Sequence, residues 1–172
     1  MNINFNINLT SNQQKAYDLF HQKETKEMLL LFSRQQGKTV FAELMIMETA
    51  LKYKNATIVY ISPLYTQGKK VYREIISCLE PHNLIEKKDG SSLTITLFNK
   101  TIIQFFTTLS PTAIRGTTCT HLLVLDEAAF FPEKTSTGED LWYNIIQPIT
   151  KTRKPKILYI STPNGKRGIF YK

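Results

Sequence analysis

Short apolar runs alternate with longer mixed segments through most of the chain. The runs lie at residues 28–32, 57–61, 121–126 and 156–161. The first run is wholly apolar, which is typical of a parallel strand buried on both faces. The segments at residues 38–54 and 66–79 have the pattern of helices. Because strands that alternate with helices form βαβ units, we expect an α/β fold with three layers around a mainly parallel sheet.

Residues 92–107 follow a different pattern. Leu93, Ile95 and Leu97 alternate with polar residues, and a turn at Asn99 leads into a second apolar run at residues 101–106. This alternation predicts an antiparallel β-hairpin appended to the parallel core. The chain has no repeats, low-complexity segments or Pro/Gly/Ser-rich linker, so we expect one domain over residues 1–172.

The composition favours a soluble globular protein. Of the 172 residues, 42% are hydrophobic and 21% are charged, which is enough apolar material for one buried core. The longest uninterrupted apolar run, at residues 28–32, is too short to cross a membrane, and the N-terminus does not resemble a signal peptide. Cys78 and Cys119 suggest no disulfide framework, and we expect reduced thiols in a cytosolic compartment.

The positive charge concentrates towards the end of the chain. The formal net charge is +8, and residues 141–172 contain seven Lys or Arg side chains and no Asp or Glu. A solvated basic surface explains such a run, and so does contact with the phosphates of DNA or RNA. The charge alone leaves both interpretations open.

A phosphate-binding loop is predicted between the first strand and the next helix. Backbone amides and a helix N-terminus favour anions at such a place, Lys38 can reach the β- and γ-phosphates, and Thr39 can ligate Mg²⁺. Phe32 stands where the usual motif has glycine, so an ordinary strand–loop–helix turn is the alternative. The predicted ATP-binding residues of the loop are Ser33, Arg34, Gln35, Gln36, Gly37, Lys38 and Thr39.

Two adjacent carboxylates end the apolar run at residues 121–126. Asp126 can hold a hydrated Mg²⁺, whereas Glu127 can activate a water for attack on the γ-phosphate. Solvated acids at an exposed strand end are the alternative. A phosphate loop and an acidic pair that each follow a predicted strand together indicate hydrolysis of ATP or GTP.

Three weaker signals refine this hypothesis. Gln13 precedes the first strand, where its amide can read the adenine edge and select ATP, although a helix cap at Thr10 or Ser11 also explains the segment. Ser161 and Thr162 end the fourth run, where they can sense the γ-phosphate or simply begin a turn. Lone arginines are usually surface residues, but the two that can neutralise transition-state charge are Arg34 and Arg115.

With these motifs in place, the sequence resembles the N-terminal ATPase domain of the large terminase subunit of tailed bacteriophages, a genome-packaging motor. The resemblance rests on the loop at residues 33–39, where an arginine replaces the usual glycine-rich start. It also rests on Leu125–Ala129, on Ser161–Gly165 and on Gln13 ahead of the first strand. These matches span nearly the whole chain.

The resemblance implies a P-loop NTPase core of the ASCE type, similar to RecA and the helicases. It implies ATP and Mg²⁺ as ligands, and double-stranded DNA, a portal protein and a small terminase subunit as partners. It also implies a homo-oligomeric ring, typically of five subunits, at the procapsid portal in the host cytoplasm, with no membrane. No acidic cluster follows residue 165, so we expect an isolated ATPase domain without the family's C-terminal nuclease, as a monomer or a ring.

The resemblance also implies roles for individual residues. Lys38 and Thr39 would bind phosphate and Mg²⁺, Asp126 would bind Mg²⁺, and Glu127 would be the catalytic base. Ser161 and Thr162 would couple hydrolysis to movement. Arg34 matches a loop arginine that acts on the γ-phosphate, and Arg115 is similar in placement to an arginine that related motors offer to a neighbouring subunit.

Two other functions compete with this interpretation. A superfamily-2 helicase or another DNA translocase shares the glutamine, the loop and the acidic pair, but it would need a second motor domain with its own arginine. A nucleotide-dependent assembly module would bind ATP without significant hydrolysis. Glu127 argues against such a module, because binding alone does not need a base.

Overall fold

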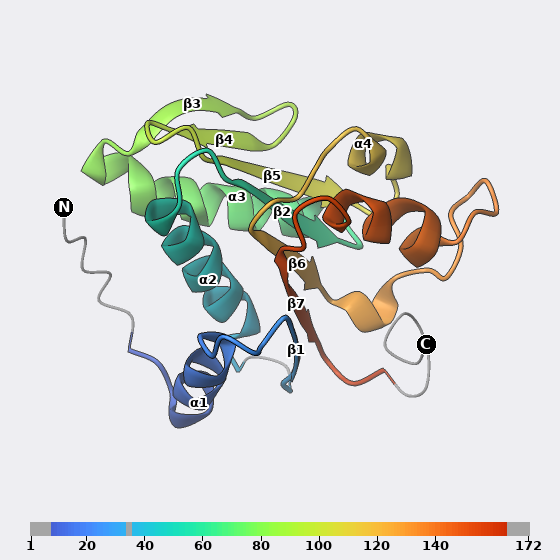
Figure 1. Cartoon of the computed structure of the whole chain (residues 1–172), viewed down its shortest axis with the longest axis horizontal. Coiled ribbons are helices and arrows are strands. Elements are labelled where there is room, and N and C mark those ends of the chain that lie inside the picture. The colour runs from blue at the N-terminus through green and yellow to red at the C-terminus, as the bar shows by residue number, and fades with distance from the viewer. Residues whose placement is uncertain (1–7, 34–35, 165–172) are drawn as a thin grey trace.

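The fold is built on one twisted sheet of seven strands (Figure 1). The computed structural model describes residues 8–33 and 36–164. The strand order is β1-β7-β6-β2-β5-β4-β3, in which the first five strands are parallel and the pairings β5–β4 and β4–β3 are antiparallel. The strands are β1 (Glu27–Leu31), β2 (Thr57–Ser62), β3 (Ile85–Asp89), β4 (Thr94–Leu97), β5 (Ile102–Thr107), β6 (Leu122–Asp126) and β7 (Lys156–Ser161). The predicted, mainly parallel α/β fold is confirmed.

Helices cover both faces of the sheet. One face packs against α1 (Ser11–Phe20), α2 (Lys38–Lys52) and α3 (Tyr65–Leu79), which continues into η1 (Glu80–His82). The other face packs against α4 (Pro111–Arg115), η3 (Trp142–Ile146) and η4 (Gln147–Thr150), while η2 (Ala128–Phe130) follows β6. Side chains of β2 alternate between the two layers, with Tyr60 in the first and Ile61 in the second. This alternation joins both layers into one core.

The predicted hairpin is present, but its second strand belongs to the parallel core. β5 pairs antiparallel with β4 and parallel with β2, where Phe105 lies opposite Tyr60. The side chains of Ile103 and Phe105 are buried, so β5 is a central strand. The sequence pattern did not indicate β3, which pairs with β4 at the sheet edge. Its three middle residues are all exposed, so it lacks the alternation that marks a half-buried strand.

The first predicted strand is not buried on both faces. β1 is an edge strand, and Leu29 and Leu31 keep 49% and 48% of their surface exposed, whereas Leu30 keeps 6%. Leu30 and the partly buried Met28 face the layer of α1 and α2. A wholly apolar run therefore predicted the strand correctly and its burial wrongly, because the run does not specify which strand lies beside it.

The predicted helices and the predicted free cysteines agree with the fold. α1, α2 and α3 lie where helices were predicted. Cys78 and Cys119 are free cysteines. Among the described residues, no helix is long and apolar enough to cross a membrane.

The edge position of β1 predicts unequal effects of two similar substitutions. We expect Leu30→Ala to lower the free energy of unfolding by about 2–5 kcal/mol, because it removes buried methyl groups and leaves a cavity. Leu31→Ala, the matched control on the exposed face, should lower it by about 1 kcal/mol or less. Denaturant unfolding followed by circular dichroism measures both values. Equal losses would show that both faces of β1 are covered.

Candidate nucleotide-binding site

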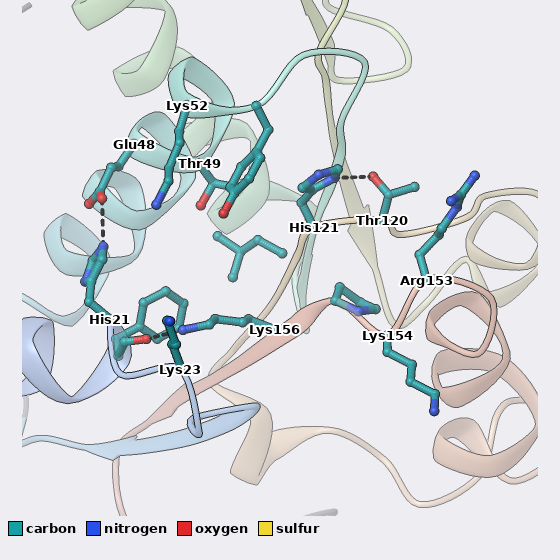
Figure 2. Close-up of a pocket in the computed structure, with 14 residues that line it drawn as sticks. His21, Lys23, Glu48, Thr49, Lys52, Thr120, His121, Arg153, Lys154 and Lys156 are labelled. Carbon is teal, nitrogen blue, oxygen red and sulfur yellow. Dashed lines mark hydrogen bonds and ion pairs between the residues drawn. The ribbon is translucent and has the colours of Figure 1, made fainter.

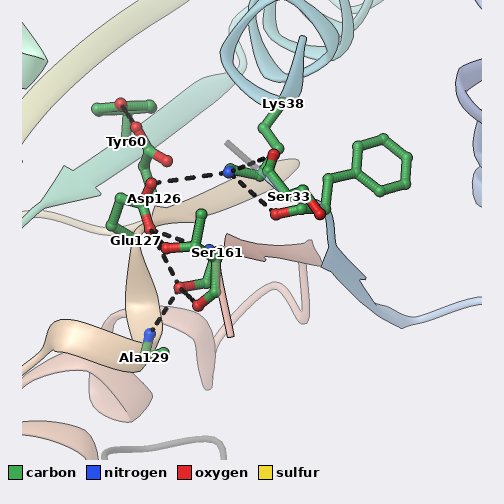
Figure 3. Close-up of polar contacts among 9 residues, drawn as sticks. Ser33, Lys38, Tyr60, Asp126, Glu127, Ala129 and Ser161 are labelled. Atoms are coloured by element: carbon green, nitrogen blue, oxygen red, sulfur yellow. Dashed lines mark hydrogen bonds and ion pairs between the residues drawn. The ribbon is translucent and has the colours of Figure 1, made fainter. Parts of the chain in front are cut away.

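The site lies where three neighbouring strands end. β1, β7 and β6 are adjacent and parallel, so their carboxyl ends meet at one edge of the sheet. The residues at or directly after these ends are the beginning of the predicted phosphate loop, the acidic pair and the Ser161–Thr162 pair. Figure 3 shows Lys38, Glu127 and Ser161 converging at this edge. The tertiary structure thus joins motifs that are far apart in the sequence.

Lys38 begins α2 and points back towards the end of β1. Only 7% of its surface is exposed, and its Nζ donates to the carbonyl oxygens of Phe32 at 3.2 Å and Ser33 at 3.3 Å. The same Nζ lies 3.9 Å from Glu127 Oε1. Before the helix, Gly37 has φ +72°, and a Cβ there would collide with the Gln13 amide nitrogen. The loop therefore requires glycine at this position.

Glu127 is held by the pair of residues that were predicted to couple hydrolysis to movement. Its Oε2 accepts hydrogen bonds from Ser161 Oγ at 3.2 Å, from the Thr162 backbone N–H at 3.1 Å and from Thr162 Oγ1 at 3.1 Å. Ser161 Oγ in turn accepts from the Ala129 N–H at 3.3 Å. The backbone of Glu127 is left-handed, with φ 50°. This turn out of the strand direction separates its carboxylate from that of Asp126.

Asp126 is a buried carboxylate with a partner that sequence reasoning missed. It is 5% exposed, and its Oδ2 accepts a short hydrogen bond from the Tyr60 hydroxyl. Burial raises the pKa of Asp126 to about 6, while the bond from Tyr60 opposes that rise. Burial also raises the pKa of Tyr60 well above its usual value, so the hydroxyl keeps its proton. The available signal was a single tyrosine within the buried positions of β2.

The donor atoms at this edge suit Mg²⁺. Asp126 offers a carboxylate oxygen that is not used by Tyr60, and Thr39 stands in the first turn of α2, half-buried. Among the described residues, no group of three or more His, Cys, Asp or Glu side chains could hold a metal. A hard cation that takes one or two protein oxygens and completes its shell with phosphates and water fits this arrangement.

Gln13 has a structural task next to the loop. Its Oε1 accepts from the Thr10 N–H at 2.8 Å, and its own N–H donates to Thr10 Oγ1 at 3.3 Å, so the predicted helix cap is confirmed. Its Nε2 donates to the Gly37 carbonyl at 3.1 Å. A cavity of ≈ 460 Å³ opens beside it, lined also by Phe32 and Gln36. One amide hydrogen and one lone pair of Gln13 remain for a ligand in this cavity.

The described residues show no contact between the predicted arginines and the other residues of the site. Arg34 and Gln35 lie outside the described residues, as does residue 165 of the last motif. Arg115 lies at the end of α4, where its Nη2 pairs with Glu139 Oε1 at 2.5 Å. Its side chain is 44% exposed. Within residues 8–33 and 36–164, no ion pair or hydrogen bond joins it to Lys38 or Glu127.

The sequence also matches a known family. The profile of the family described as terminase large subunit, T4likevirus-type, N-terminal, matches residues 29–171. The chain belongs to this family. The matched region of this terminase contains the phosphate loop, the acidic pair and the Ser161–Thr162 pair, and leaves out only α1 and Gln13 among the parts of the site. A search of curated proteins gave no match.

Solved structures of phage terminases share the fold of this terminase chain. The large terminase ATPase domain of Thermus phage P74-26 has a TM-score of 0.70 at 21% identity, over 86% of this chain and 63% of that one. The large terminase of a thermophilic bacteriophage has a TM-score of 0.75 at 17% identity, over 96% and 42%. The complex of that same terminase with ATP-gamma-S gives 0.70 at 17%, over 92% and 39%. This terminase chain therefore spans less than two thirds of each relative.

The raised pKa of Asp126 predicts a pH-dependent stability. A carboxyl group with a folded pKa of about 6, against its usual 3.8, binds its proton more tightly in the folded state. It therefore stabilises the fold fully below about pH 4, and this stability is lost as the pH rises to about 6. Without metal, we expect the free energy of unfolding of wild type to fall over this pH range by on the order of 2 kcal/mol more than that of Asp126→Asn.

Thermal unfolding at pH 4, 5, 6 and 7 in EDTA measures this difference. Adding Mg²⁺ at pH 7 should then raise the melting temperature of wild type and leave that of Asp126→Asn unchanged, because the amide is a poor ligand for the ion. Parallel pH curves for the two proteins would show that Asp126 has an ordinary pKa. An equal response to Mg²⁺ would move the metal to other residues.

Proposed function

We propose that this chain is the ATPase domain of a viral DNA-packaging motor. In this proposal it hydrolyses ATP in a Mg²⁺-dependent reaction and uses the energy to move double-stranded DNA into a procapsid. The observation that carries the proposal is the position of Glu127, which lies beside Lys38 and is bonded by Ser161 and Thr162. Similar terminases support it, since one is a solved ATPase domain and another was solved with ATP-gamma-S.

Lys38 is proposed to hold the β- and γ-phosphates. Its ammonium group is buried and bonded only to neutral carbonyl oxygens of Phe32 and Ser33, with Glu127 as the nearest carboxylate among the described residues. A phosphate oxygen would provide a stronger, charge-assisted bond at this place. The amino end of α2 directly behind it also favours an anion.

The two oxygens of Glu127 are proposed to have different tasks. Oε2 accepts three hydrogen bonds, which fix the orientation of the carboxylate. Oε1 faces Lys38, and hence the place proposed for the γ-phosphate. Oε1 is thus positioned to accept a proton from an attacking water, as a general base must. Asp126 and Thr39 would hold Mg²⁺, which, when bound, supplies positive charge to the phosphate oxygens.

The bonds to Ser161 and Thr162 offer a route from chemistry to movement. Both residues lie at the end of β7, and both contact the oxygen of Glu127 that does not face the loop. A change in the position or charge of Glu127 during hydrolysis would alter these bonds directly. We therefore assign Ser161 and Thr162 to coupling, because they connect the proposed base to the chain that follows.

The remaining parts of the proposal rest on the family. Arg34 and Arg115 are the candidates for the residue that neutralises charge in the transition state, and Arg115 would first have to leave Glu139. The proposed partners are double-stranded DNA, a portal protein, a small terminase subunit and further copies of the chain in a ring, at the portal in the host cytoplasm.

Substitution of Glu127 tests the proposed function. Glu127→Gln keeps the shape of the side chain but cannot accept a proton, so ATP binding should persist while turnover falls by about 10²-fold or more. Lys38→Ala should instead weaken ATP binding itself. Steady-state turnover and calorimetry separate the two effects, and exposed Glu133→Gln is the matched control. Turnover by Glu127→Gln within a few-fold of wild type would refute the assigned base. A wild type that binds but never hydrolyses would be an assembly module.

Gln13 predicts a preference for ATP over GTP. Its free amide hydrogen and lone pair match N7 and N6 of adenine, whereas O6 of guanine presents the reversed pattern. We expect wild type to bind ATP more tightly than GTP, and Gln13→Ala to lose most of that difference. Thr10→Ala is the control, because it weakens the same helix cap and leaves the amide in place. Equal affinities in wild type would leave Gln13 with only its structural task.

A further inference from the structure

A second, larger cavity lies at the amino ends of the parallel strands, opposite the ends that form the nucleotide site (Figure 2). It has a volume of ≈ 660 Å³, and its walls come from the segment after α1, the end of α2, the start of β6 and the loop before β7. Leu122 and Lys156, the first residues of β6 and β7, line it. The nucleotide site is at the other end of these strands, roughly 15–20 Å away. This cavity is therefore separate from the nucleotide site.

The lining is strongly basic. Its cations are Lys23, Lys52, Arg153, Lys154 and Lys156, which come from three distant segments of the chain. Its one carboxylate, Glu48, is engaged by His21 at 2.7 Å. Within residues 8–33 and 36–164, none of the five cations forms an ion pair. The folded chain thus gathers positive charge here and leaves it without a counter-ion of its own.

The charges perturb one another. Burial, followed by the nearby charges of Lys26 and Lys52, lowers the pKa of Lys156. Burial and then the charge of Arg153 lower the pKa of His121, which also lines the cavity. In both cases the neighbouring cations make a further positive charge unfavourable. An anion placed between them would relieve this repulsion.

Aromatic rings hold part of the cluster in place. The Nζ of Lys156 lies 4.9 Å from the centre of the Phe20 ring and also donates to the carbonyls of Phe20 and Gln22. The Nζ of Lys52 lies 5.5 Å from the centre of the Tyr53 ring. Lys23, Arg153 and Lys154 are exposed residues of the lining, and they form the rim of the cavity. The arrangement combines the partly buried charge of Lys156 with exposed charges at the rim of the cavity.

We propose that this cavity binds phosphate groups of the DNA backbone. The inference rests on the proposed function, which supplies DNA as the polyanion. Unpaired cations around one opening match a polymer that carries a regular series of negative charges, and such contacts depend on charge and not on base sequence. Three of the seven cations of the basic run at residues 141–172 line the cavity, while Lys166 and Arg167 lie outside the described residues.

The location also links DNA to the nucleotide site. β6 begins at the cavity and ends at Asp126, and β7 begins at Lys156 and ends at Ser161. The two strands are paired from Leu122 and Lys156 to Asp126 and Ile160. Each strand thus has one end at the proposed DNA contact and the other at the residues proposed for catalysis and coupling. A shift of β6 or β7 along its own axis would move residues at both sites.

Neutralising the rim tests the inference. Arg153→Gln/Lys154→Gln removes two exposed cations that have no role in the nucleotide site. Binding of a fluorescent 30-base-pair duplex is measured by anisotropy between 50 and 200 mM salt. At low salt we expect affinity to fall by about tenfold, and the slope of log affinity against log salt to become shallower by about 1.8, since each lost phosphate contact contributes about 0.9.

The matched control removes the same charge from two residues that do not line the cavity. Arg73→Gln/Lys87→Gln changes exposed residues of α3 and β3 that form no ion pair among the described residues. Its slope should stay within about 0.3 of wild type. An unchanged slope in Arg153→Gln/Lys154→Gln would overturn the inference. Equal changes in both double variants would also overturn it, because they would reflect net charge alone.

Two further measurements locate the contact and its ligand. Bound duplex should protect Lys23, Lys52 and Lys154 from acetylation, as read by mass spectrometry, but leave Lys87 reactive. Pyrophosphate or an acidic peptide that displaces the duplex only at far higher concentration supports a DNA site. If the rim variant lost peptide or pyrophosphate binding but kept its affinity for DNA, the cavity would belong to that ligand and the inference would fail.

The same variants separate this inference from the proposed function. Because the cavity and the nucleotide site lie at opposite ends of β6 and β7, Arg153→Gln/Lys154→Gln should keep the wild-type ATP turnover measured without DNA. If the protein binds DNA through the cavity but never hydrolyses ATP, the proposed function is refuted and the inference stands. If the protein hydrolyses ATP but the rim variant keeps its full affinity for DNA, the inference fails and the proposed function stands.

Discussion

The carboxylate of Glu127 joins the separate parts of the proposed nucleotide site. One oxygen lies 3.9 Å from Lys38, and the other accepts bonds from Ser161 and Thr162. These contacts exist because β1, β7 and β6 are adjacent and parallel, so the residues that follow the three strands meet at one edge. The left-handed backbone at Glu127 then turns its side chain away from the strand. Any shift of one strand relative to the others would break this set of contacts.

Burial of charged side chains at this end of the sheet destabilises the fold, and the bonds that compensate for it also order the side chains. Lys38 and Asp126 are 7% and 5% exposed, and a buried charge without partners destabilises a fold by several kcal/mol. Two carbonyl oxygens stabilise the ammonium group, and the Tyr60 hydroxyl stabilises the carboxylate. These bonds also fix the side chains before a substrate arrives. The structure therefore provides oriented charges in a site of low solvent exposure, which is the arrangement that the proposed hydrolysis of ATP would use.

The sequence by itself determined the elements and the chemical character of the site. Its apolar runs located four parallel strands, the segments after the first two runs located α2 and α3, and the cap signal at Thr10 located the start of α1. The order of strand, Gly37-Lys38-Thr39 and helix, together with Asp126 and Glu127 after another strand, indicated a nucleotide site. These signals are local, because a strand needs its own apolar residues and a phosphate loop needs its own glycine and lysine. Local chemistry of this kind can be read without knowing what lies opposite.

Only the tertiary structure decided which elements are neighbours. It placed β1 at the edge, so Leu29 and Leu31 are half-exposed despite an apolar run, and it made β5 a central strand through its pairing with β2. It also brought Tyr60 to Asp126 and Ser161 to Glu127. The cations of the second cavity come from segments separated by up to about 130 residues. Pairing order and side-chain contacts depend on packing over the whole chain, and the local pattern of residues does not contain them.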